Sequence, residues 1–125
     1  MTDLEKHVNQ PGRAKLVKKV REKINELGIT YIYYQNADYF STLKFARKFQ
    51  TLYPKNENIA YIDFLIAMTF YEQVQIVARD QTYTKAALKE FRNIVKKYPT
   101  SKYAKESELK IDLINEQLKY LVGFW

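Results

Sequence analysis

Few residues in this sequence could do chemistry, and their spacing does not favour it. His7 is the only histidine and there is no cysteine, so a cysteine nucleophile and a thiolate metal site are both excluded. A lone histidine also has no partner for a metal site or a catalytic dyad. No glycine-rich loop that could cradle a phosphate occurs. The sequence therefore predicts a protein without catalytic residues, metal or cofactor.

Carboxylates gather near the C-terminus, where a pair could in principle act as general acid and base. Glu106, Glu108, Asp112 and Glu116 are interspersed with lysines along a helical stretch. Acidic and basic residues that alternate along one helix are typical of a solvated face, where they support the helix by side-chain pairs. We interpret these carboxylates as an exposed surface and not as a catalytic pair.

The charge balance permits an acidic partner. Lys and Arg total 21 against 14 Asp and Glu, a formal net charge of +7. Such an excess allows a nucleic acid, an anionic membrane surface or an acidic protein to bind. A basic nucleic-acid-binding module therefore stays as an alternative, although the densest basic run occupies the polar side of its helix, opposite the apolar stripe: Lys15, Lys18, Lys19, Arg21 and Lys23.

The elements that carry these residues are predicted to be helices. Three Gly and three Pro in 125 residues leave long stretches without breakers, and apolar residues recur every three or four positions. Thr2 and Glu5 have capping-box spacing for a short helix over residues 2–8. No apolar run is long enough to span a bilayer, and the first dozen residues lack the hydrophobic segment of a signal peptide. Longer helices are expected over residues 16–34, 39–53, 59–74, 87–98 and 103–121, with Asp38 and Thr100-Ser101 as caps.

Two of these helices end in the same Tyr-Pro pair, 45 residues apart. Superimposing Tyr53-Pro54 on Tyr98-Pro99 also pairs Leu43 with Leu88, Ala46 with Phe91, and Phe49 with Ile94. Self-similarity of this kind indicates stacked repeats, in which each helix pair needs a neighbour to cover its apolar face. We predict an all-α fold of tetratricopeptide-like antiparallel helix hairpins in a short right-handed superhelix. The expected organisation is an N-terminal segment 1–18 and a repeat domain 19–125, with repeats at about 19–55 and 56–100 and a following helix at 101–121.

The 45-residue offset exceeds the usual 34-residue tetratricopeptide period by about eleven residues. The extra residues fall around Val77 to Thr84, so RDQTYT is predicted to be an enlarged turn within the second repeat. A long polar turn suggests a partner contact by Arg79, Asp80 and Gln81. The alternative is that Asp80, Thr82 or Thr84 only caps the next helix.

Aromatic residues provide further candidates for binding. Most of the eleven Tyr and seven Phe are expected in the core, but some could line a groove for extended or amphipathic peptides. The candidates for this groove are Tyr33, Tyr61, Phe64, Met68 and Tyr71. A second candidate is an apolar patch at the C-terminal helix, expected to favour self-association or a partner: Leu118, Leu121, Val122, Phe124 and Trp125.

From Tyr33 to Trp125 the sequence resembles the BamD (ComL) family, tetratricopeptide lipoproteins of the bacterial complex that assembles outer-membrane β-barrels. The resemblance rests on YYQNADY, FARKFQTLYPKNENIAYIDFLIAMTFYEQV, the RDQTYT turn with ALKEFRNIVKKYP, and SKYAKESELKIDLINEQLKYLVG. The family's secretion signal, lipid-bearing cysteine, first repeat and C-terminal repeats have no counterpart in the sequence. A truncated or diverged family member, binding either the family's partners or another protein, is therefore expected.

The resemblance implies a non-enzymatic scaffold at the periplasmic face of the outer membrane. Its implied partners are the barrel-forming assembly protein, other assembly lipoproteins and unfolded outer-membrane proteins. Binding is expected on the concave surface formed by the first helix of each pair.

Overall fold

The computed structural model describes residues 13–75 and 80–124, except for some side chains near the ends of this range. The described residues form helices and contain no strand, which confirms the all-α prediction. The short helix expected over residues 2–8 lies outside them. The helices are α2 (Arg13–Gln35), α3 (Tyr39–Leu52), α4 (Ile59–Tyr71), α5 (Thr82–Lys97) and α6 (Lys102–Phe124).

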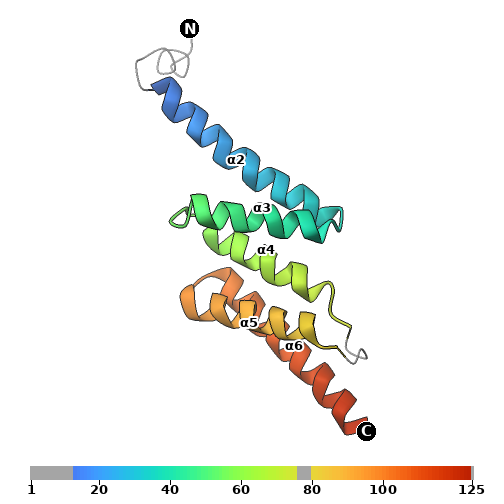
Figure 1. The fold of residues 1–125 in the computed structure, drawn as a ribbon. Helices are drawn as coiled ribbons and strands as arrows, with labels where there is room; N and C mark the ends of the chain where they lie inside the picture. The colour runs from blue at the N-terminus through green and yellow to red at the C-terminus, as the bar shows by residue number, and fades with distance from the viewer. Residues whose placement is uncertain (1–12, 76–79, 125) are drawn as a thin grey trace.

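The helices pack in chain order as an elongated array (Figure 1). We call α2, α4 and α6 the first helices and α3 and α5 the second helices, after their order in each hairpin. The first helices contact one another directly, since α4 packs on both α2 and α6 as well as on the second helices. The start of α2 and the end of α6 lie at opposite ends of the array (Figure 1).

Side chains at the helix starts account for where α3 and α6 begin. Asp38 Oδ1 accepts a hydrogen bond from the Ser41 backbone N–H at 3.2 Å, as expected of an N-cap. Ser101 Oγ accepts from the Ala104 N–H at 3.1 Å in the same way. Both predicted caps are therefore confirmed.

The connection between α2 and α3 is tight. The Asp38 N–H donates to the Tyr33 carbonyl at 2.9 Å and the Ala37 N–H donates to the Tyr34 carbonyl at 3.0 Å. These two bonds form a Schellman motif, which places Ala37 in the left-handed region with φ of 58°. Glycine is the usual residue there because a Cβ is strained at positive φ.

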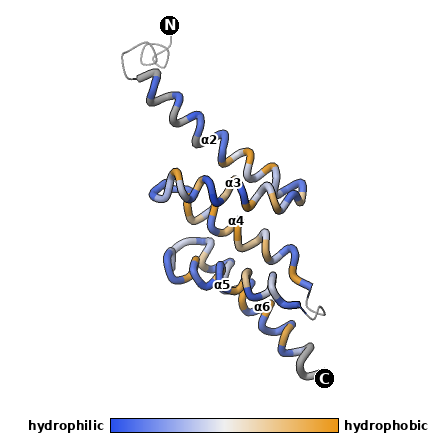
Figure 2. The backbone as a smooth tube through the Cα atoms, viewed as in Figure 1, coloured by the Kyte–Doolittle hydropathy of each residue, from blue (hydrophilic) through white to orange (hydrophobic). Residues whose placement is uncertain are grey.

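The core runs along both sides of α4. One cluster joins α3 and α4 through Ala46, Phe49, Ile62 and Ile66, all fully buried. A second cluster joins α4, α5 and α6, and its buried members are Ala67, Ala87, Leu88, Phe91, Ile94 and Ile114. Figure 2 shows α4 largely in the shades of hydrophobic residues. A helix with apolar residues around most of its circumference is thus packed on two sides.

The positions paired by the 45-residue offset are inward positions in both hairpins. Ala46 and Phe91 are fully buried, as is Phe49, and Ile94 is nearly so. Leu88 lies in the second cluster and Leu43 packs against the first. The repeat of the sequence is therefore a repeat of packing.

Candidate protein-binding surface

Tyrosines from all three first helices lie close together. Tyr61 of α4 is tilted against Tyr103 of α6, with ring centroids 6.0 Å apart. Tyr34 of α2 donates a hydrogen bond to Glu72 Oε1, just after α4, at 3.4 Å. Tyr31, one turn before Tyr34, is exposed, and its hydroxyl accepts from Gln35 Nε2 at 2.6 Å. We call these four residues, Tyr31, Tyr34, Tyr61 and Tyr103, the tyrosine face.

The hydroxyls of the tyrosine face influence one another. Burial, followed by the neighbouring Tyr31 and Tyr103 hydroxyls, raises the pKa of Tyr61 to about 12. Burial and then the Glu72 carboxylate raise the pKa of Tyr34 to about 12. Tyr34 and Tyr61 therefore stay neutral at physiological pH, and the face presents hydroxyl groups beside aromatic rings.

The predicted groove residues do not all lie together. Tyr33 stacks on Phe45 of α3, with centroids 5.3 Å apart and planes at 16°, and so belongs to the seam within the first hairpin. Phe64 lies against both Phe91 and Tyr103, at 6.1 and 5.4 Å. Of the candidate set, Tyr61 and Phe64 adjoin Tyr103, whereas Tyr33 faces another helix.

Two further candidates pack between α4 and the helices that follow it. Met68 and Tyr71 are half-buried against the second core cluster. The Tyr71 ring meets Phe91 edge-on at 6.1 Å, and Lys110 Nζ lies 4.7 Å from the Tyr71 centroid. Met68 and Tyr71 therefore lie at the edge of the hydrophobic core. The Lys110 ammonium group also forms a cation–π contact with the Tyr71 ring.

The connection between α4 and α5 is longer than that between α2 and α3, as expected from the offset. The predicted turn is shorter than RDQTYT, however, because Thr82, Tyr83 and Thr84 belong to α5. Asp80 Oδ1 accepts from the Thr82 N–H at 3.0 Å and from the Thr82 hydroxyl, and these bonds lower the pKa of Asp80. Thr84 Oγ1 donates to Gln81 Oε1 at 2.8 Å. Asp80 and Gln81 thus shape the first turn of α5. Their predicted partner contact stays a prediction, and Arg79 lies outside the described residues.

The C-terminal helix exposes apolar side chains that the sequence analysis did not single out. Leu118 is half-buried against the second core cluster. Leu109, Leu113 and Tyr120 on the opposite side of α6 are exposed. The side chains of Leu121, Val122 and Phe124, and all of Trp125, lie outside the described part of the chain. Self-association through this helix stays a prediction.

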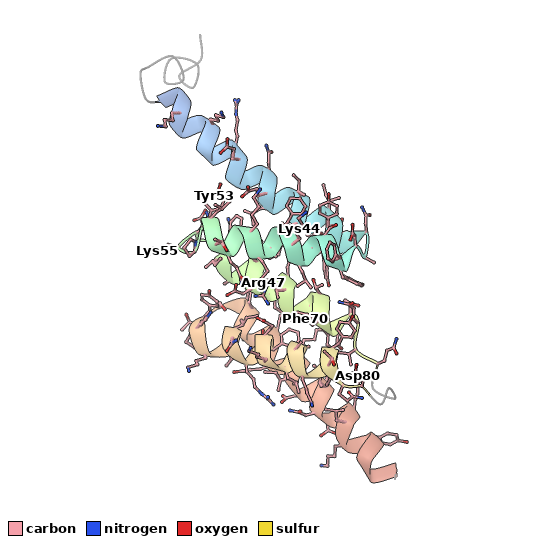
Figure 3. The ribbon with its side chains drawn as sticks, in the orientation of Figure 1. Lys44, Arg47, Tyr53, Lys55, Phe70 and Asp80 are labelled. Carbon is pink, nitrogen blue, oxygen red and sulfur yellow. The ribbon has the colours of Figure 1, made fainter. Side chains whose placement is uncertain are left out.

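A polar groove lies between α3 and α5, with a volume of about 470 Å³. Arg47 bridges its two sides by an ion pair with Glu90 at 3.0 Å. At its base Asp63 of α4 is only 6% exposed, and its carboxylate accepts from Gln50 Nε2 at 2.6 Å and from the Tyr98 hydroxyl at 2.9 Å. Figure 3 labels Arg47 on α3, on the side where this groove opens. The network ties α3, α4 and α5 together.

Comparison with known proteins identifies the family to which this helical array belongs. Residues 17–121 match the model of the YfiO family, described as outer membrane lipoprotein. The chain belongs to this family. Proteins named outer membrane protein assembly factor BamD are among its relatives, with 37% identity over 98 residues in Caulobacter vibrioides and 36% over 93 residues in Rickettsia prowazekii. A third, from Pasteurella multocida, is 28% identical over 102 residues.

This YfiO-family chain spans only part of those relatives. The matches cover 74–76% of the chain but 32%, 37% and 39% of the three relatives. Within the described residues, no helix is long and apolar enough to cross a membrane. The same residues contain no cluster of three or more His, Cys, Asp or Glu side chains suited to a metal ion.

Sequence reasoning about this family member missed some surface residues that it could have found. Tyr31 and Tyr34 are separated by three positions, which places them on one side of α2, whereas Tyr33 lies on another. Leu109 and Leu113 are one turn apart and opposite the buried Ser107 and Ile114. No sequence signal marked Asp63 as buried, because its donors come from two other helices.

Proposed function

We propose that this chain is a non-catalytic protein-binding scaffold in outer-membrane protein assembly. Its membership of the YfiO family and the names of its relatives support this role. By the family resemblance, the partners are the barrel-forming assembly protein, other assembly lipoproteins and unfolded outer-membrane proteins. The site of action is the periplasmic face of the outer membrane.

The proposed binding site for an extended polypeptide is the tyrosine face. The observation that carries this proposal is the approach of Tyr61 to Tyr103, with Tyr31 and Tyr34 beside them, across three successive first helices. Strands of outer-membrane barrels carry aromatic residues at their interfacial ends and unpaired backbone groups before they insert. Rings and neutral hydroxyls suit such a ligand, because the rings contact its side chains while the hydroxyls bond to its backbone.

A nucleic-acid-binding function is supported less well. It requires the basic residues of α2 to converge with exposed rings. Lys18 and Tyr31 are both exposed but stand thirteen positions apart on one helix, which is about 20 Å along its axis.

Fluorescence anisotropy with a labelled peptide from an outer-membrane barrel strand tests the proposal. At moderate salt we expect saturable binding, and Tyr31→Ala should weaken it on the order of tenfold, as for an aromatic residue at the centre of an interface. Tyr83→Ala is a matched control, because Tyr83 is 45% exposed and Tyr31 43%, but Tyr83 belongs to the second helix α5. Equal losses in the two variants, or no saturable binding, would exclude the tyrosine face.

A further inference from the structure

The charge of this chain is distributed very unevenly among its helices. The second helices α3 and α5 together contain eight basic residues and one acidic residue, a net of +7. Helix α4 carries a single charged residue, Asp63, and α6 carries four basic and four acidic residues. Helix α2 carries six basic and two acidic residues, a net of +4, so the second helices hold the larger share of the positive charge.

These basic residues lie on one side of the molecule. Arg47 from α3 and Lys89 and Lys97 from α5 border the same groove, so the exposed sides of the two helices flank a common opening. Helical spacing places Lys44 and Lys48 one turn apart on α3. On α5 the spacing gives one exposed stripe, which is Lys85, Lys89, Arg92 and Lys96. Figure 3 labels Lys44 and Arg47 on α3 and Lys55 in the connection after it.

Acidic side chains neutralise little of this surface. Glu90 pairs with Arg47, and Glu26 of α2 lies 3.7 Å from Lys48. Lys85 lies near Asp80 and helps to lower the pKa of that carboxyl. No ion pair joins a described acidic residue to the remaining exposed cations of α3, α5 and the connection after α3. We name the whole set the basic face: Lys44, Arg47, Lys48, Lys55, Lys85, Lys89, Arg92, Lys96 and Lys97.

Apolar side chains stand among these cations. Phe40 is 81% exposed and lies one turn before Lys44 on the same side of α3. Leu52, at the other end of α3, is 50% exposed. An exposed phenylalanine beside an exposed lysine is typical of surfaces that rest on a bilayer, where the ring enters the headgroup boundary and the cation remains outside it.

The kind of cation also favours a lipid surface. Seven of the nine residues are lysine and two are arginine. Lysine is a compact, strongly hydrated charge that acts through diffuse attraction, whereas bidentate recognition of individual carboxylates favours arginine. Headgroups of an anionic membrane form such a diffuse field, which attracts each nearby basic residue.

We propose that the basic face rests on an anionic lipid bilayer, with Phe40 and Leu52 inserted at the headgroup level. The contact is made by the second helices and leaves the tyrosine face, built on the first helices, available to a polypeptide. This inference does not depend on peptide binding, because it concerns other residues and another ligand.

Sedimentation with vesicles tests the proposal on the full chain. We expect binding to vesicles containing phosphatidylglycerol, little binding to phosphatidylcholine alone, and weakening by salt. Replacing Lys44, Lys89 and Lys96 by Gln should weaken binding on the order of 100-fold at low salt. The control replaces Lys102, Lys105 and Lys119 of α6 by Gln, which changes the net charge equally and should lower binding far less.

Phe40→Ser separates a bilayer from other polyanions. It should weaken binding to the anionic vesicles on the order of tenfold, because the inserted ring is lost. Binding to polyglutamate or to a single-stranded oligonucleotide should not change. Equal loss in the two lysine variants, equal binding to both kinds of vesicle, or no effect of Phe40→Ser on vesicle binding would each overturn the proposal.

Discussion

Tyr53 and Tyr98 end the second helices of the two hairpins, and each lies beside a carboxylate of the first helix that precedes it. Tyr98 donates to Asp63 of α4 at 2.9 Å, and burial followed by this contact raises its pKa to about 12. Burial followed by the Glu26 and Glu22 carboxylates of α2 raises the pKa of Tyr53. The equivalent tyrosines therefore serve the same purpose, which is to join the end of a second helix to its own first helix.

The two hairpins differ in the number of aromatic and apolar side chains that pack around their buried phenylalanines. Phe91 in the second hairpin contacts the rings of Phe64 and Tyr71, and its cluster extends to α6. In the first hairpin Phe49 contacts the Tyr53 ring at 5.1 Å, and its cluster involves α2, α3 and α4. On the outer side of α2, Ile29 and Ile32 are exposed. In stacked repeats, stability comes from neighbours as much as from each unit, so the second hairpin should be the more stable one.

Truncation of the buried phenylalanines gives the largest expected effect. Phe91→Ala should lower the free energy of unfolding by about 3–5 kcal/mol, since the ring is fully buried among other rings. Phe49→Ala should cost less, because fewer aromatic side chains surround the space it leaves. Urea unfolding followed by circular dichroism measures both. An equal or greater loss for Phe49→Ala would remove the distinction between the hairpins.

Removing the hydroxyl of either tyrosine that contacts a carboxylate should have a smaller effect on the free energy of unfolding. Tyr98→Phe leaves one Asp63 oxygen without its donor inside the protein and should cost about 1–3 kcal/mol. Tyr53→Phe is the matched variant and should cost less, because Glu26 also has Lys48 as an ion-pair partner. Both variants are compared by urea unfolding at neutral pH.

The pH dependence identifies the cause of that loss. The Tyr98 pKa is about 12 in the folded chain and 10.0 in its ordinary state, so the unfolded chain releases this proton first as pH rises. The stabilisation is complete below pH 10 and is lost between pH 10 and about 12. Tyr98→Phe should make this decline less steep. If the variant and the parent decline in parallel, the hydroxyl does not contribute as described.

The smallest expected effect concerns the turn of the first hairpin. Ala37 holds a positive φ of 58° at the position of the Schellman motif where glycine is favoured. Ala37→Gly should therefore stabilise the chain by about 0.5–1 kcal/mol, after the added flexibility of the unfolded chain is subtracted. Thermal unfolding should show a higher midpoint. The second hairpin, with its longer connection, contains no equivalent position among its described residues.

Much of the fold could be predicted because it depends on local rules. The spacing of Leu43, Ala46 and Phe49 defines one side of a helix, and the same spacing after 45 residues defines its repeat. Asp38 and Ser101 were recognisable as caps because a short polar side chain can reach the free N–H groups of the next turn. Tyr-Pro ends a helix because proline has no N–H and restricts the residue before it.

The binding surfaces were predicted less completely. The sequence pattern of aromatic residues did not distinguish between tyrosines that contact different helices. Tyr33 stacks on α3, whereas Tyr31 and Tyr34 lie next to α4. In the sequence Asp63 is a single charged residue on an apolar helix. Its burial could not be predicted, because the hydrogen bonds that stabilise it come from Gln50 and Tyr98 in two neighbouring helices. The net charge was known from the sequence, but which cations share one surface depends on which sides of α3 and α5 remain exposed.

The sequence by itself determined the helices, the caps of α3 and α6, the repeat and the family resemblance, since helical periodicity and capping act over a few residues. Only the tertiary structure decided which rings meet across α2, α4 and α6, which carboxylate is buried, and which cations share a surface. These properties depend on how whole helices are placed against one another. Residues dozens of positions apart, such as Arg47 and Glu90, become neighbours through that packing.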